Sequence, residues 1–281
     1  MNARSIPLSL IATLVLASAC AGTRSAKTAA VAPAPAVPTR FAYAPSTGQY
    51  RIAATSKSSQ EVMGQKQEMQ ITTNRLVTVA LARTAPDTLS MAIVVDSFTM
   101  TNSMGVTPPG MDKLIGSKFS AKLSPFGAFY SAEGPKESDV PNAGQFTNEM
   151  GRILPRINAV LAPGAAWTDT VSDKITQGGL DLTRTVISRF SVAGDTTIGS
   201  EKAWKIVRQS TTSVSGSGAP GGQSVTVETT GTAKGTILIS RQGVLIGGES
   251  EEQSTGKAVV AASGMEVGIT AVNTATFQKV K

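Results

Sequence analysis

Residues 89–100 read LSMAIVVDSFTM, and their apolar side chains fall on every second position until the pattern changes. Period two is typical of an extended strand, in which successive side chains point to opposite faces. One face takes Leu89, Met91, Ile93 and Val95. Phe98 and Met100 take the other face, so the phase changes near Asp96. This pattern predicts a strand that either contains a β-bulge near Asp96 or is buried on both faces.

The same alternation, rich in threonine, serine and valine, continues on both sides of this stretch from Gly48 onward. Further strands are predicted around 117–123, 127–132, 166–176, 180–193, 203–215, 223–240, 244–260 and 265–279. Glycine and proline mark the turns between strands, at Gly64, Pro86, Pro125–Gly127, Gly178–Gly179, Gly194–Asp195, Gly218–Gly222 and Gln242–Gly243. Long strands joined by short turns pair with their sequence neighbours. The fold class is therefore mainly β, with one long antiparallel meander that forms a curved sheet or half-barrel.

Residues 142–161 break this rhythm, because their apolar side chains recur at helical spacing. Asn142 is available as the N-cap, and Pro163-Gly164 ends the segment. Pro155 lies inside it and predicts a kink or two short helices. We expect this segment to cover the concave face of the sheet, either as a fixed helix or as a mobile lid.

The N-terminus has the pattern of a secretory signal. Arg4 precedes an apolar run over 6–16, and small residues then lead into Cys20, the chain's single cysteine. The run is shorter than the roughly 20 residues that span a bilayer. We expect residues 1–19 to be a lipoprotein signal peptide and Cys20 to carry the lipid. The alternative is simple secretion with a nearby cysteine.

Lipidation of Cys20 would make the membrane a partner of this chain through several buried acyl chains. Ala21 follows Cys20, where aspartate commonly retains lipoproteins in the inner membrane. The expected location is therefore the periplasmic face of the outer membrane. Residues 20–44 are rich in alanine and proline and predict a flexible tether. Residues 45–281 form a single β-rich domain.

Composition narrows the chemistry. The chain has no histidine, which excludes histidine-based catalysis and imidazole metal sites. The net charge is +7, and it is scattered along the sequence with only 5% aromatic residues, so we expect no nucleic-acid partner. No cofactor is expected, and the sequence leaves the oligomeric state open.

The motifs that resemble functional signatures fit structural roles better. Residues 216–221 match G-x-G-x-x-G, but Pro220 and the strand that follows favour a hairpin loop. Ser254 and Lys257 have a catalytic spacing that requires a helix, and they lie in a predicted strand. The carboxylates Glu249, Glu251, Glu252, Asp169, Asp173 and Asp181 are interpreted as a solvated face. Trp167 and Trp204 are expected to anchor the core of the sheet.

Several short sequence motifs follow one another along the chain in a characteristic order. They are Gly48-Gln49-Tyr50, Met63-Gly64-Gln65, Leu114-Ile115-Gly116 with Phe119, Pro125-Phe126-Gly127, Leu154-Pro155, Pro163-Gly164-x-x-Trp167 and Ser240-Arg241-Gln242-Gly243. Over residues 45–280 this order resembles a family of bacterial envelope lipoproteins of unknown function. The resemblance implies a curved sheet with helices in its concave side, similar to lipoprotein carriers of the LolA/LolB type. It implies no catalytic residues.

Two hypotheses for function follow. The first is a lipid-anchored, non-enzymatic module that binds a lipid or other hydrophobic ligand in a groove of the curved sheet. The residues expected to line that groove are Met91, Ile93, Phe146, Met150 and Ile157. The second is a structural or interaction protein of the envelope whose sheet is filled by its own side chains. An enzyme ranks third.

Overall fold

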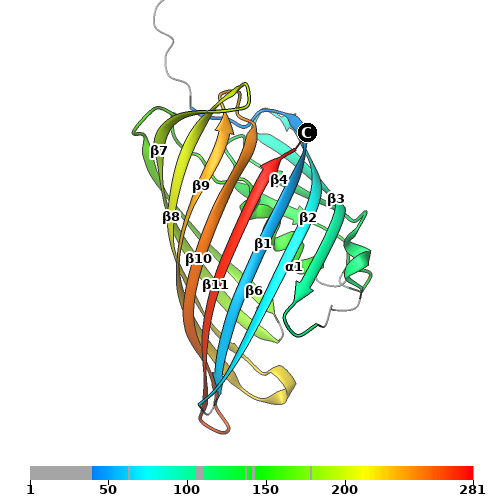
Figure 1. Ribbon diagram of the computed structural model, residues 1–281, viewed down its shortest axis with the longest axis vertical. Helices are drawn as coiled ribbons and strands as arrows, with labels where there is room; N and C mark the ends of the chain where they lie inside the picture. Colours follow the sequence, from blue (N-terminus) through cyan, green and yellow to red (C-terminus); the bar gives the residue numbers. More distant parts are fainter. Residues whose placement is uncertain are drawn as a thin grey trace, which may run out of the picture. The chain divides into compact units, whose positions relative to one another are not determined.

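The computed structural model describes residues 40–62, 64–105, 110–136, 138–140, 143–177 and 179–280. These residues form one antiparallel sheet of eleven strands (Figure 1). The strands are β1 (Ser46–Val62), β2 (Gln65–Ala85), β3 (Thr88–Asn102), β4 (Lys118–Leu123), β5 (Phe129–Glu133), β6 (Ala166–Gln177), β7 (Leu180–Ile198), β8 (Glu201–Gly218), β9 (Val225–Ser240), β10 (Leu245–Val260) and β11 (Met265–Lys279). Two 3-10 turns, η1 (Met111–Leu114) and η2 (Pro220–Gly222), lie between strands.

The sheet consists of two meanders joined along one ladder. Its order is β5-β4-β3-β2-β1-β11-β10-β9-β8-β7-β6, so the first and last strands of the domain pair with each other. β5 and β6 form the two edges of an open, curved sheet. The predicted fold class, a long curved antiparallel meander, is confirmed.

Of the two alternatives predicted for residues 89–100, the bulge is present in β3. Leu76 pairs with Ser97 and the next residue, Val77, pairs with Val95, which leaves Asp96 as the extra residue. The Asp96 carboxylate accepts hydrogen bonds from Thr78 Oγ1 at 2.7 Å and from Gln49 Nε2 at 3.0 Å. The extra residue reverses the side-chain alternation, and this explains why the apolar phase changes within one continuous strand.

The turn predicted at Gly194–Asp195 is wrong. β7 continues to Ile198, and the register shifts between Val192 and Gly194 mark a second bulge. Gly194 has φ of 139°, which a bulge can accommodate without reversing the chain. The actual turn follows Ile198, with Gly199 at φ of 60°.

The helix expected near 142–161 is α1 (Ala143–Ile153), and it occupies only the first half of that segment. Asn142 lies outside the described residues. Pro155 ends the helix rather than kinking it, because proline supplies no backbone N–H and its ring excludes the helical conformation before it. The linker after α1, residues 154–157, is non-helical.

One end of the sheet is closed by residues 40–45, which we call the strap. The backbone N–H groups of Phe41, Tyr43 and Ala44 donate to the carbonyl oxygens of Ala159, Pro125 and Gly243 at 3.0, 2.7 and 3.1 Å. The fully buried Tyr43 side chain donates its hydroxyl to Pro155 O at 2.9 Å. The strap therefore ties the linker and two hairpin turns together at this strapped end.

The opposite end of the sheet carries the turns between β1 and β2, β6 and β7, β8 and β9, and β10 and β11 (Figure 1). We call it the hairpin end. The fully buried side chains gather toward the strapped end and include Leu89, Met91, Leu123, Ile157, Ile206 and Ile239. Among the described residues, no helix is long and apolar enough to cross a membrane.

Candidate ligand cavity

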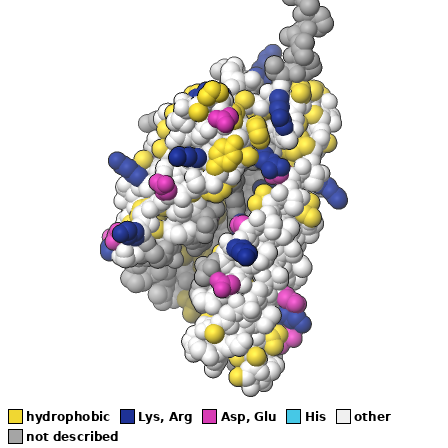
Figure 2. Space-filling view, turned by 180° about the vertical axis from the view of Figure 1, so that it is seen from behind, with side chains coloured by type: hydrophobic (Ala, Val, Ile, Leu, Met, Phe, Trp, Pro, Cys, Tyr) yellow, Lys and Arg dark blue, Asp and Glu magenta, His cyan; other side chains and the backbone are white. Residues whose placement is uncertain are grey.

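A cavity of about 1020 Å³ lies in the concave face of the sheet, beneath α1 and the linker. Its walls come from strands of both meanders, and α1 contributes Phe146, Thr147, Glu149 and Ile153. Pockets for small organic ligands are typically about 300–1,000 Å³. Viewed from behind, the molecule shows a cleft with basic and acidic side chains on its wall (Figure 2). The curved sheet is therefore not filled completely by its own side chains.

The apolar part of the lining faces the strapped end. Its members include Tyr50, Ile52, Val77, Val79, Leu81, Ile93, Val95, Phe119, Phe190, Ile237, Leu245 and Phe277. These residues come from strands far apart in the sequence, and period-two alternation places all of them on the concave face.

The middle of the cavity has a floor of small residues. Ala233 and Gly235 of β9 and Ser250 of β10 line the cavity there. A Cβ atom at Gly235 would lie 2.4 Å from the backbone oxygen of Glu249, so only glycine fits without moving a strand. The small floor leaves the space above it open.

Charged residues of both signs also line the cavity. Leaving out Lys174 and Glu249, whose strand positions place their side chains on the outer face, the described lining residues include four basic and four acidic side chains. The basic residues are Arg75, Arg156, Arg184 and Arg208, and the acidic residues are Glu149, Asp169, Asp173 and Glu252. The cavity therefore carries a balanced charge in these described residues.

One ion pair joins the sheet to α1. Arg75 Nη1 of β2 lies 3.0 Å from Glu149 Oε2, and the Arg75 side chain is only 17% exposed. The same guanidinium stacks over the Phe146 ring at 5.0 Å. Phe146 also contacts Phe98 and Phe119, with centroid distances of 6.1 and 6.0 Å. Arg75 and these aromatic contacts hold α1 against the concave face.

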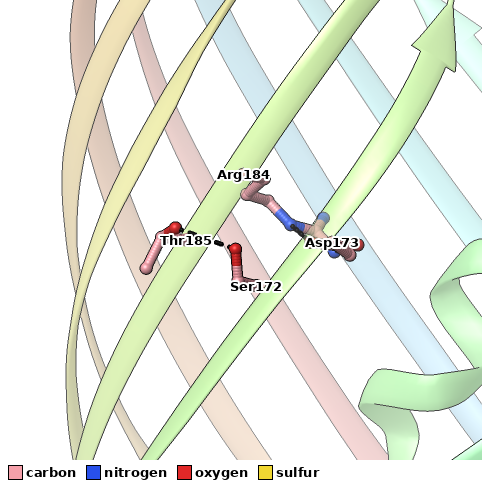
Figure 3. Close-up of polar contacts among 4 residues, drawn as sticks. All are labelled: Ser172, Asp173, Arg184 and Thr185. Atoms are coloured by element: carbon pink, nitrogen blue, oxygen red, sulfur yellow. Dashed lines mark hydrogen bonds and ion pairs between the residues drawn. The ribbon is translucent and has the colours of Figure 1, made fainter.

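A second ion pair spans the β6–β7 hairpin. Arg184 Nε donates to Asp173 Oδ1 at 2.9 Å, and Arg184 Nη2 donates to Asp173 Oδ2. Ser172 and Thr185, one position away on each strand, share a 3.2 Å hydrogen bond (Figure 3). Because side chains alternate, the ion pair faces the cavity while the hydroxyl pair lies on the outer face.

A third pair contradicts the interpretation of the carboxylates as a solvated face. Asp169 is 7% exposed, and its Oδ1 lies 2.9 Å from Arg156 Nη2 of the linker. The contact is an ion pair without hydrogen-bond alignment, since Oδ1 has no hydrogen-bond partner. Strand period two turns Asp169 and Asp173 inward, and their arginine partners come from other segments.

The tryptophans differ in their surroundings. Trp204 is buried, with the Arg241 guanidinium 3.4 Å from its ring centroid. Trp167 is half-buried and stacks on Phe190, whose ring centroid is 5.0 Å away. Its indole N–H donates to Arg156 O at 3.0 Å, which attaches the linker to β6. Phe190 lines the cavity, and Trp167, its pairing partner on β6, lies beside it on the same concave face.

The residues predicted to line a groove are placed as follows. Ile93 and Phe146 line the cavity. Met91 and Ile157 do not line the cavity. Both side chains are fully buried in the packed core near the strapped end. The backbone of Met150 lies in α1. Cys20 lies outside the described residues.

Sequence reasoning missed the charged part of the cavity. Arg75, Arg184 and Arg208 look like scattered surface charges in the sequence. The available signal was their position in the alternation. Arg75 is an even number of residues from Val77 and Val79, and Arg208 is two residues from Ile206, so each arginine lies on the same face as these core residues. A basic residue in phase with core residues points inward.

The motif candidates occupy structural positions. Residues 216–218 lie in β8, and η2 follows at the hairpin end. Ser254 and Lys257 lie in β10, on opposite faces. Within the described ranges, no group of three or more histidine, cysteine, aspartate or glutamate residues could hold a metal ion.

No model of a protein family and no curated protein matches the chain. Among solved structures, a DUF1329 family protein from Desulfovibrio piger is 10% identical and has a TM-score of 0.22, with 80% of this chain and 84% of that chain covered. A putative outer membrane lipoprotein-sorting protein domain from Vibrio parahaemolyticus is 9% identical, with a TM-score of 0.20 and coverage of 82% and 83%.

A third solved structure is the COG4313 outer membrane channel from Pseudomonas putida, which is 7% identical and has a TM-score of 0.19, with 86% of this chain and 98% of that chain covered. The chain itself is a curved antiparallel β-sheet.

Proposed function

We propose that this protein is a lipid-anchored, non-enzymatic binding protein of the bacterial cell envelope, and that its cavity holds a lipid or other hydrophobic ligand. The observation that carries the proposal is the cavity of about 1020 Å³ between α1 and the sheet, with an apolar wall toward the strapped end. Burial of an acyl chain against such a wall is favourable by roughly 0.8 kcal/mol per CH₂.

The alternative function is a structural or interaction protein with a self-filled sheet. That function needs no cavity, because side chains from opposite walls would meet beneath α1. The small floor at Ala233 and Gly235 favours ligand binding instead, since small residues there keep the space open.

The anchor belongs to the same proposal. The signal-like segment before Cys20 supports lipidation of that cysteine and a location at the periplasmic face of the outer membrane. The described residues begin at Arg40, the first residue of the strap.

Native mass spectrometry of the full chain, purified from the envelope, tests the binding function. The expected result is a stoichiometric adduct with the mass of an amphiphile, which dissociates at raised collision energy. A protein that carries no adduct and takes up none from added lauroyl lysophosphatidylcholine would contradict the proposal.

A pair of variants on β9 provides the matched control. Ala233→Phe places a large ring into the cavity, whereas Thr232→Phe places the same ring on the outer face, where Thr232 lies opposite Thr211 and Gln253. Only Ala233→Phe should lose the adduct. Far-ultraviolet circular dichroism and thermal melting establish that both variants are folded.

A further inference from the structure

We infer that the cavity selects amphiphiles with a zwitterionic head group, and that this head lies between Arg208 of β8 and Glu252 of β10. The inference rests on the proposed function and names the ligand class. Both residues are half-buried and line the cavity.

The first argument is the polarity gradient along the strands. On β8, the inward-facing residues run from Ile206 near the strapped end to Arg208 and then Ser210. On β10, Gly248 and Ser250 precede Glu252 in the same direction. An amphiphile that follows this gradient directs its chain toward the strapped end and its head toward the hairpin end.

The second argument is the position of the two residues across the small floor. Arg208 pairs with Gly235 of β9, and Glu252 pairs with Ala233. Two ladder spacings separate β8 from β10, about 9.6 Å. Because β9 contributes only a glycine and an alanine between them, a cation and an anion face the same space from its two sides.

The third argument is charge balance. The inward-facing side chains of the described lining are four basic and four acidic. A head group with a single charge would match one sign and displace water from the other, which is unfavourable in a partly buried site. An uncharged head would displace water without replacing its interactions with the ions. A zwitterion carries both signs, so it can place its anionic group beside Arg208 and its cationic group beside Glu252.

Lauroyl amphiphiles that differ only in the head group test this inference. The series contains lysophosphatidylcholine and lysophosphatidylethanolamine as zwitterions, lysophosphatidylglycerol as the anion, lauroylcholine as the cation and monolauroylglycerol as the uncharged member. Each is titrated into the full chain below its critical micelle concentration. We expect both zwitterions to bind about tenfold more tightly than each other class.

Variants that change one charge should shift this preference in opposite directions. Glu252→Gln leaves an excess of positive charge and should favour lysophosphatidylglycerol, whereas Arg208→Gln should favour lauroylcholine. Controls on the outer face are Glu251→Gln, which removes the partner of Lys234, and Arg189→Gln, next to Phe190 on β7. These controls should keep the zwitterionic preference.

The outcomes separate the two proposals. If no member of the series binds, the proposed function fails. If all head groups bind equally, or if inner and outer variants shift the preference alike, the zwitterionic inference is wrong and the hydrophobic binding function stands. Opposite shifts for Glu252→Gln and Arg208→Gln, with unchanged controls, support it.

Discussion

Two buried tyrosines, Tyr43 and Tyr50, help to hold the strapped end together. Their raised pKa values make the stability of the folded protein depend on pH. Tyr50 donates its hydroxyl to Leu245 O at 2.8 Å. Burial, with a smaller contribution from the negative charge of Glu201, raises the pKa of Tyr50 to about 12. Burial also raises the pKa of Tyr43 well above its usual value of 10.0.

A raised tyrosine pKa means that the folded state holds its proton more tightly than the unfolded state does. Its stabilising contribution is therefore complete below pH 10 and is lost as pH rises from about 10 to about 12. We expect Tyr50→Phe to lose less stability than the wild type over this range. Urea denaturation at several pH values measures it, and parallel curves for the two proteins would contradict the argument.

Gly127 provides a second test at the residue scale. Its φ is 89°, and a Cβ there would lie 2.6 Å from Pro155 O and 3.0 Å from the Tyr43 ring. Gly164 has a similar φ of 80° with nothing within 4 Å of its Cβ position. Gly164→Ala should cost about 1–2 kcal/mol from backbone strain. Gly127→Ala should cost about 1–3 kcal/mol more, because it adds a clash. Equal losses in denaturant would show that the strap and linker do not constrain this position.

At the scale of elements, α1 depends on a few side chains that reach the sheet. Phe146 packs between Phe98 and Phe119 and beneath Arg75. Phe146→Ala should therefore weaken α1 locally, by about 1–3 kcal/mol. The linker should hold its place, because the strap, the β4–β5 turn and Trp167 each donate a hydrogen bond to it or accept one from it.

Hydrogen exchange measures this difference by segment. We expect faster exchange over 143–153 in Phe146→Ala and little change in the linker. Phe129→Ala on β5 is the control, since Phe129 is 45% exposed and makes no aromatic contact with α1 among those described. Uniform acceleration across the sheet in Phe146→Ala would contradict the local role.

The elements also show what the sequence can and cannot predict. Strand periodicity is local, so alternation alone predicted the strands, whereas the register was needed to choose a bulge at Asp96 over a strand buried on both faces. Gly194 has the composition of a turn, yet its neighbours Val192 and Phe190 continue a buried ladder that overrides it. The cavity depends on strand register. Arg208 and Glu252 are far apart in sequence, and only the pairing of β8, β9 and β10 places them on the two sides of the small floor.

At the scale of the whole molecule, the described domain begins in the strap at Arg40, and residues 20–44 are proposed to link it to a lipid anchor. The anchor itself is a proposal with a direct test. Cys20→Ser should release the protein from sedimented membranes into the soluble envelope fraction, because loss of the acyl chains removes about 0.8 kcal/mol per buried CH₂. Unchanged sedimentation would show that another feature holds the protein at the membrane.

The central claim is that an amphiphile occupies the cavity, and Trp167 can report it. This residue stacks on Phe190 of the cavity wall, whereas Trp204 lies farther toward the strapped end beneath Arg241. In the full chain with Trp204→Phe, lysophosphatidylcholine with a brominated acyl chain should quench Trp167 fluorescence saturably. Quenching should be weaker in Trp167→Phe, where Trp204 reports. Equal quenching of both tryptophans, or none for Trp167, would contradict a ligand in this cavity.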